Sequence, residues 1–181
     1  MNKIMTTLLI TAAITGAALA INTQGNTGQD RTESRASTVK FVLVETPKYS
    51  LEIPADWKMG DETPWGATDI TPKVGQGKLG AMTAGPTQAS WAELFETSMY
   101  FIKREEPGTP TAIREGKTKI GYASASFEVV NKKGFANRRY TLLRNGSGNV
   151  LALSIKIPSI AEEEALTKIF RHMVDTAKIK S

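Results

Sequence analysis

The most regular stretch of this 181-residue chain reads Leu151-Ala152-Leu153-Ser154-Ile155-Lys156-Ile157. Aliphatic side chains occupy every second position, and the positions between them hold Ala152, Ser154 and Lys156. Successive side chains of a strand point to opposite faces, so this alternation predicts a strand with one buried face and one face in a more polar setting.

A helix is predicted directly after this strand. Pro158 is followed by Ser159 and, three positions later, by Glu162, which is the pattern of a capping box. The residues beyond it carry one apolar stripe of about four helical turns, which we expect to dock on the sheet. The stripe consists of Leu166, Ile169, Phe170, Met173, Val174 and Ala177.

The residues before the quoted stretch have strand character and are separated by turn residues. Three strands are predicted, over 111–114, 117–130 and 136–144. The turns between and after them are expected at Glu115-Gly116, at Lys132-Lys133-Gly134 and at Asn145-Gly146-Ser147-Gly148. Short turns join antiparallel neighbours, so these strands predict an antiparallel meander.

A hairpin is predicted near the start of the ordered chain. Its strands cover the β-branched run 39–44 and the alternating run 49–53, which Pro47 separates. Trp57 follows in a turn and is placed to fold back over the second strand.

Two short strands, over 66–71 and 78–84, are predicted after the hairpin. Ser90 and Glu93 then form another capping box, which opens a helix over 91–104. The helix should stop before Pro107, because the residue preceding a proline resists helical geometry.

The order of elements favours an α+β fold. Runs of hairpin-linked strands with few helices predict an antiparallel sheet of about six to seven strands with flanking helices, rather than a parallel Rossmann-type sheet. The length is that of a single domain, which we place at residues 38–181.

One motif points to a known superfamily. Tyr49-Ser50-Leu51-Glu52-Ile53-Pro54-x-x-Trp57, followed by a helix, a three-stranded meander and a terminal amphipathic helix, resembles the PsbP-like superfamily, which includes the DcrB-like envelope proteins. The resemblance covers about residues 38–181 and implies a PsbP-like α/β/α sandwich. It also implies a binding or assembly factor, because most members are non-enzymatic. The chain lacks the anchoring cysteine of the lipoprotein members and the metal-ligand patterns of the photosystem protein, so no family site is transferred.

The first residues read as an export signal. Lys3 precedes an uncharged run over 4–19, and Ala18-Leu19-Ala20 offers the small residues that a signal peptidase accepts. An uncleaved anchor is the alternative, although the run is shorter than the roughly 20 residues of a spanning helix. Residues 21–37 are polar and are expected to form a flexible leader. The sequence therefore predicts a periplasmic or secreted protein that does not stay inserted in the membrane after cleavage.

Several patterns with chemical associations are better explained structurally. Gly75-Gln76-Gly77-Lys78-Leu79-Gly80 has the letters of a dinucleotide fingerprint but is followed by a strand-like piece instead of a helix. His172, the single histidine, lies beside the apolar stripe and has no recognisable triad partners. Glu162-Glu163-Glu164 suits the positive end of a helix dipole. We therefore expect no catalytic residue, no metal and no cofactor.

The composition argues against nucleic acid as a partner. The net charge is +5, yet 23 basic residues are scattered among 18 acidic ones, and an exported chain seldom meets nucleic acid. The chain has no cysteine, which excludes thiol catalysis and thiolate metal sites.

A basic strand face is the candidate binding surface. Even-numbered spacing places Arg138 and Arg144 on one face of the strand, whereas Arg139 points the other way. If the closing helix covers the opposite face, this side is open to an anionic ligand or partner. Solvated charges that discourage aggregation are the alternative. The candidate residues are Arg138, Tyr140, Arg144, Lys132 and Lys133.

Trp65 is a second candidate, because it lies in a loop between Pro64 and Gly66. A loop tryptophan is a plausible binding anchor, and a core plug is the alternative.

Two function classes follow. The preferred one is an exported, non-enzymatic module that binds an envelope protein or a small anionic ligand. The alternative is an extracytoplasmic hydrolase with an Asp, Glu or Ser site, for which no nucleophile, base and orienting group can be selected together.

Overall fold

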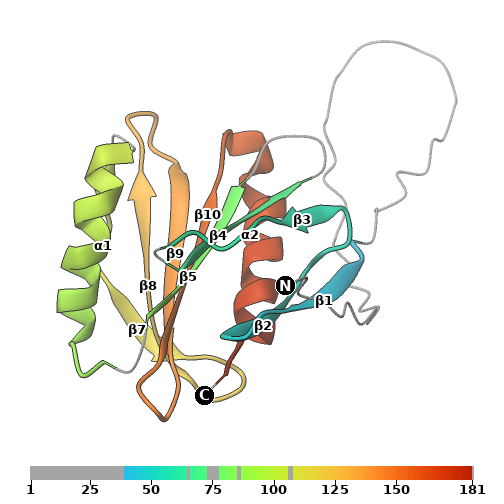
Figure 1. Cartoon of the computed structure of the whole chain (residues 1–181). Helices are drawn as coiled ribbons and strands as arrows, with labels where there is room; N and C mark the ends of the chain where they lie inside the picture. The colour runs from blue at the N-terminus through green and yellow to red at the C-terminus, as the bar shows by residue number, and fades with distance from the viewer. Residues whose placement is uncertain (1–38, 65, 73–77, 85–86, 106–107, 181) are drawn as a thin grey trace, which may run out of the picture.

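The computed structural model describes residues 39–64, 66–72, 78–84, 87–105 and 108–180. The expected signal segment (1–20), the expected leader (21–37) and Trp65 lie outside these residues. Figure 1 shows two helices on either side of a large sheet, with a smaller sheet beside one of the helices.

The larger sheet has eight strands, and every pairing in it is antiparallel. Seven strands follow one another across the sheet, and the eighth, β7 (Arg114–Lys117), pairs with β8. The spatial order is β3 (Trp57–Met59), β4 (Ala67–Pro72), β5 (Lys78–Ala84), β10 (Val150–Lys156), β9 (Ala136–Arg144), β8 (Ala123–Val130) and β6 (Thr109–Pro110). The predicted α+β class and antiparallel sheet are confirmed.

The smaller sheet contains the predicted N-terminal hairpin. Strands β1 (Phe41–Glu45) and β2 (Tyr49–Pro54) pair antiparallel, and the short β11 (Lys178–Ile179) adds to the other edge of β2. Trp57, in β3, is buried in the same core cluster as Leu51 and Ile53 of β2, as expected from its position after the hairpin.

The two helices cover opposite faces of the larger sheet. Helix α1 (Trp91–Glu105) packs Met99 and Ile102 against Phe127 and Tyr140. Helix α2 (Ile160–Thr176) covers the opposite face together with the smaller sheet. The main core lies under α2 and includes Leu143, Leu151, Leu153, Ile155, Leu166, Phe170 and Met173.

The meander differs from its prediction at one turn. Glu115 and Gly116 belong to β7, and the chain reverses near Gly121, which has a φ of +89°. The amide of Gly121 donates to the Thr118 carbonyl at 3.0 Å, which closes the turn. Glycine adopts a positive φ without steric cost, so the chain can reverse at Gly121. The predicted turn at Glu115-Gly116 is therefore wrong.

The capping boxes behave differently at the two helices. At α1 the Ser90 amide donates to Glu93 Oε2 at 2.7 Å, and the Glu93 amide donates to Ser90 Oγ at 3.3 Å, so the predicted box is complete. At α2 the Ser159 hydroxyl donates to Glu162 Oε2 at 2.7 Å, but the Ser159 side chain does not cap a helix amide.

The α1 capping box predicts a pH dependence of stability. The Ser90 amide, and then the Ser90 hydroxyl, lower the pKa of the Glu93 carboxyl by donating hydrogen bonds to it. A lowered folded-state pKa stabilises the protein above the unfolded-state pKa, and this stabilisation is lost as the pH falls through the folded-state pKa. Glu93→Gln should therefore lower the melting temperature at neutral pH, with the difference shrinking on acidification. Circular dichroism melts across this range measure it; a constant difference would contradict the assignment.

Candidate binding site

Two of the predicted binding residues take part in the packing beneath α1. The Tyr140 ring is 9% exposed and stacks on Phe127 with centroids 4.8 Å apart and an interplanar angle of 8°. Arg138 Nη1 donates to the Tyr140 hydroxyl at 3.0 Å. The face that carries these residues is thus occupied by α1 and is not an open surface.

Arg144 secures the start of α1. Its guanidinium lies 4.4 Å from the centroid of the Trp91 ring, and its Nη2 donates to the Ala89 carbonyl. Cation–π contacts of this kind contribute about 0.5–2 kcal/mol. Arg144 therefore connects the end of β9 to the first turn of the helix.

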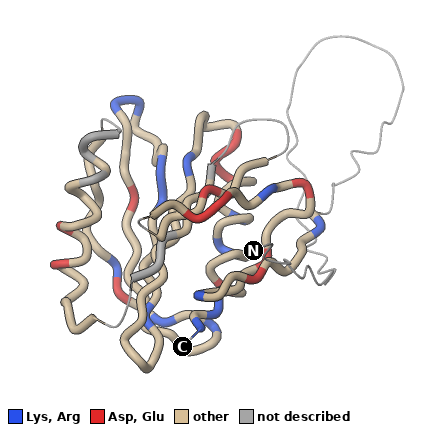
Figure 2. The backbone as a smooth tube through the Cα atoms, in the orientation of Figure 1, with Lys and Arg blue, Asp and Glu red and all other residues tan. Residues whose placement is uncertain are grey.

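The remaining basic candidates lie at one tip of the sheet. Lys132 and Lys133 are exposed in the turn between β8 and β9, which is the basic tip visible in Figure 2. Arg138 lies near this turn, whereas Arg144 lies about 20 Å further along the strand at the usual rise per residue. The structure therefore does not gather the predicted residues into one cavity.

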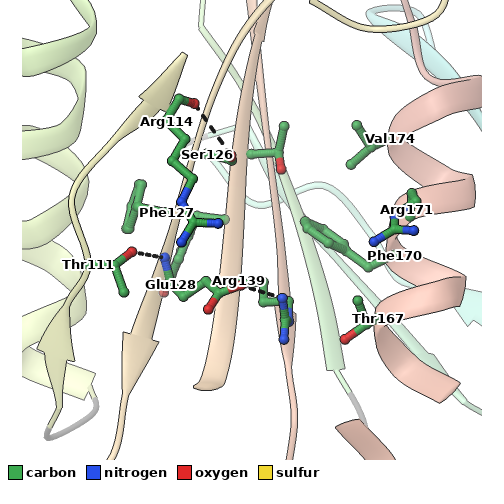
Figure 3. A pocket seen from close by; sticks show the side chains of 12 residues that line it. Thr111, Arg114, Ser126, Phe127, Glu128, Arg139, Thr167, Phe170, Arg171 and Val174 are labelled. Atoms are coloured by element: carbon green, nitrogen blue, oxygen red, sulfur yellow. Dashed lines mark hydrogen bonds and ion pairs between the residues drawn. The ribbon is translucent and has the colours of Figure 1, made fainter. Parts of the chain in front are cut away.

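A cavity of about 200 Å³ lies on the other face, between α2 and strands β7, β8 and β9. Figure 3 shows Arg114 on the strand side and Phe170, Arg171 and Val174 on the helix side. The wall also includes Arg139 and Glu128. Tyr140 is the one predicted candidate among the described residues that contributes to this wall.

Arg139 links the sheet to the helix within this site. Its guanidinium bonds Glu128 of β8 through Nη1 and Glu163 of α2 through Nη2, the latter at 2.8 Å. The three side chains are 22%, 30% and 28% exposed, so the cluster is largely shielded from water. Two carboxylates thus hold the Arg139 side chain in place, and this side chain forms part of the cavity wall.

The other two arginines have no such partner. Among the described residues, no carboxylate forms an ion pair with the guanidinium of Arg114 or Arg171. Both side chains are exposed at the cavity's edge. The cavity therefore carries two cations that are available to a ligand.

Polar atoms without partners occur in the same wall. Arg139 Nε and Thr167 Oγ1 are buried and form no hydrogen bond within the described structure. A buried polar group without a partner costs about 1–3 kcal/mol, and a buried water molecule commonly supplies the missing bond.

An open hollow continues from the cavity along α2. It shares Arg139, Thr167 and Arg171 with the cavity and extends to Ile160, which is 69% exposed. Among the described residues that line this hollow, Ile160 is the one apolar side chain, and the others are polar or charged.

The sequence carried a signal for this site that our prediction did not use. Ser126 and Glu128 of β8 alternate with apolar residues and share the inward face with Arg139 of β9. Glu163, Thr167 and Arg171 recur at a helical spacing of four. Polar residues on both elements that face each other predict a polar layer once the covering helix is known.

His172 lies away from the cavity. Its Nε2 is 2.7 Å from Glu52 Oε2, and its ring lies 3.8 Å from that of Phe41. The histidine therefore connects α2 to the smaller sheet, in line with its interpretation as a residue at the edge of the apolar stripe.

The acidic residues at the start of α2 have separate structural partners. Glu162 accepts from Ser159, Glu163 pairs with Arg139, and Glu164 pairs with Lys168. In the part of the chain that is described, no three His, Cys, Asp or Glu residues lie together as a metal site would require. Neither helix there is long and apolar enough to cross a membrane.

The fold is similar to that of a solved structure. The solution structure of cyanobacterial PsbP (CyanoP) from Synechocystis sp. PCC 6803 matches with a TM-score of 0.53 and 10% sequence identity, over 73% of this chain and 86% of that chain. The chain therefore has a PsbP-like fold, as the resemblance implied. No protein-family model matches the chain, and no curated protein matches it in sequence.

Proposed function

We propose that this chain is an exported, non-enzymatic binding module that holds an anionic partner in the cavity between α2 and strands β7 to β9. The observation that carries the proposal is the pair of arginines, Arg114 and Arg171, that reach this cavity without a carboxylate partner among the residues that the structure describes. Two unpaired guanidinium groups beside one cavity attract carboxylates and phosphates because they offer planar sets of donors.

Binding is a better use of this site than catalysis. Glu128 of the cavity wall and Glu163 of the adjoining hollow are both bonded to Arg139, so neither is free to act as a base or a nucleophile. The histidine is bonded to Glu52 elsewhere in the fold. These contacts support a binding module over the hydrolase alternative.

A protein partner suits the site better than a free small ligand. Pockets for drug-sized ligands measure about 300–1,000 Å³ and bury most of the ligand, whereas this cavity measures about 200 Å³ and continues into a hollow of about 360 Å³ that is open to the surface. The hollow beside it ends at the exposed Ile160, which would extend the contact beyond the cavity. We therefore favour an envelope protein that inserts one acidic group.

The site of action we propose is the extracytoplasmic space. The support is the sequence of residues 1–20, which predicts cleavage after Ala20. Intact-mass measurement of the protein recovered from cells tests the predicted cleavage site, since a mature chain that begins at Ile21 excludes an uncleaved anchor.

Affinity capture from the native envelope tests the proposed site. The double variant Arg114→Gln/Arg171→Gln should capture at least about tenfold less of an envelope partner than the wild type, because two charge-assisted contacts are lost. Raising the salt from about 0.1 M to about 1 M should weaken wild-type capture, because the Debye length falls from about 10 Å to about 3 Å.

Two control variants make this experiment specific. Lys40→Gln/Lys58→Gln removes the same charge from exposed positions on β3 and just before β1, and it should leave capture unchanged. Lys132→Gln/Lys133→Gln tests the basic turn predicted from the sequence. Loss of capture in the turn variant, with full capture by the arginine variant, would move the site to the basic turn.

A further inference from the structure

We infer that the group recognised in this cavity is a carboxylate of single negative charge attached to a short, branched apolar group. The inference rests on the proposed binding function and specifies its ligand chemistry. Such a group occurs in free branched-chain acids and at the C-terminal end of a polypeptide whose last residue is aliphatic.

The charge of the site favours a monoanion. The wall holds Arg114, Arg139, Arg171 and Glu128, and Glu163 of the adjoining hollow bonds Arg139. These three arginines and two carboxylates leave one positive charge. Arg114 and Arg171 are exposed and carry two positive charges, and the shielded cluster of Arg139 with Glu128 and Glu163 carries one net negative charge, so one added negative charge neutralises the set. A doubly charged phosphate would bring one more negative charge than the site needs for neutrality.

The hydrogen-bonding capacity of the wall suits a carboxylate. Its two oxygens offer about four acceptor positions, which match the planar sets of donors of two guanidinium groups. Arg114 and Arg171 supply these groups. Arg139 remains bonded to Glu128 and Glu163 and connects β8 to α2 beside the ligand.

The apolar part of the ligand has its own surface. Phe170 and Val174 project from α2 toward the strands beside Arg171, as Figure 3 shows. Phe170 is 5% exposed and belongs to the core, so this surface is held rigid. An aliphatic branch that covers Val174 would remove apolar area from water while its carboxylate contacts the arginines.

The size of the cavity limits the ligand. The cavity has a volume of about 200 Å³, which accommodates a carboxylate with a short branched chain. Longer chains would have to leave through the open hollow along α2.

The test is an NMR titration of the protein as purified from the envelope, with two probes. One is 3-methylbutanoate, and the other is the peptide acetyl-Gly-Gly-Gly-Val with a free C-terminus. At least one of the two should bind saturably and perturb the Thr167 and Arg171 amides, and which one binds distinguishes the two sources. The neutral amide of each probe should bind at least about tenfold more weakly, because the charge-assisted bonds are lost.

Three variants separate the contributions. Arg114→Gln/Arg171→Gln should weaken binding of the acid at least about tenfold, and Lys40→Gln/Lys58→Gln should leave it unchanged. Val174→Ser should reduce the preference for 3-methylbutanoate over acetate about threefold or more, because it removes apolar contact area. Val174 is only partly buried, so a wild-type melting curve can verify that this variant is folded.

Three outcomes would overturn the inference. Inorganic phosphate binding more tightly than either acid would show that the site takes a dianion. Equal binding of acids and amides would remove the role of charge. If neither probe binds, the ligand assignment fails, while capture of an envelope partner through Arg114 and Arg171 would still support the proposed function.

Discussion

Leu153→Ala is expected to lower the free energy of unfolding by about 3–4 kcal/mol. Leu153 is 0% exposed and lies in β10, between Thr141 of β9 and Ala81 of β5. It belongs to the core beneath α2, where strands on both sides prevent the space from collapsing. The loss therefore combines the transfer free energy of the removed carbons with the cost of a cavity. Urea denaturation at neutral pH measures it.

Ile160→Ala is the matched control for this prediction. It removes a similar number of carbons, but Ile160 is 69% exposed at the first turn of α2. We expect a change within about 0.5 kcal/mol. If the two variants lost equal stability, the assignment of Leu153 to the core under α2 would be wrong.

Arg139→Met is expected to lower the free energy of unfolding by about 2–4 kcal/mol. Methionine keeps most of the length of the side chain but removes the charge that holds Glu128 and Glu163. Two carboxylates, each about 30% exposed, then lack the cation that bridges β8 to α2. The expected value lies below the usual range for fully buried pairs because water reaches part of this cluster.

A second substitution identifies the cause of this loss. Adding Glu128→Gln and Glu163→Gln to Arg139→Met removes the unpaired charges and should recover about half of the lost stability. If the triple variant were less stable than Arg139→Met alone, the loss would come from packing of the arginine side chain and not from uncompensated charge. Urea denaturation of the three proteins decides between these causes.

Local patterns in the sequence predicted most elements because their causes are local. The alternation in residues 151–157 corresponds to β10, and the capping box at Ser90 and Glu93 corresponds to the start of α1. Glycine-containing turns at Gly134 and Gly148 also formed as predicted, and both glycines have positive φ. Alternation, capping and turn formation each depend on a few neighbouring residues, so the sequence displays them directly.

The elements that were missed depend on distant partners. Strand β3 is three residues long and exists by pairing with β4, and β11 is two residues long and pairs with β2. Segments this short have no detectable periodicity of their own. The turn near Gly121 was missed for a related reason, because the register between β7 and β8 selects which glycine reverses the chain.

The candidate site also combines features that the sequence predicted with features that depend on distant partners. The sequence correctly placed Arg138 and Arg139 on opposite faces of one strand, since side chains alternate. It did not show that α1 would cover the face with Arg138 and Tyr140, or that α2 would form a cavity over Arg139. Helix docking depends on the summed apolar contacts of the whole layer, which no single segment contains.

The sequence by itself determined the α+β class, the two amphipathic helices and the alternation of the central strands, because hydrophobic periodicity and capping are properties of adjacent residues. Only the tertiary structure decided which arginines are bonded to carboxylates and which line the cavity without such a bond among the described residues. Arg139 is held by glutamates from β8 and α2, whereas Arg114 and Arg171 reach the cavity from elements far apart in the chain. Which charges pair depends on which ones the fold brings within bonding distance, and that distance is set by packing of the helix on the sheet.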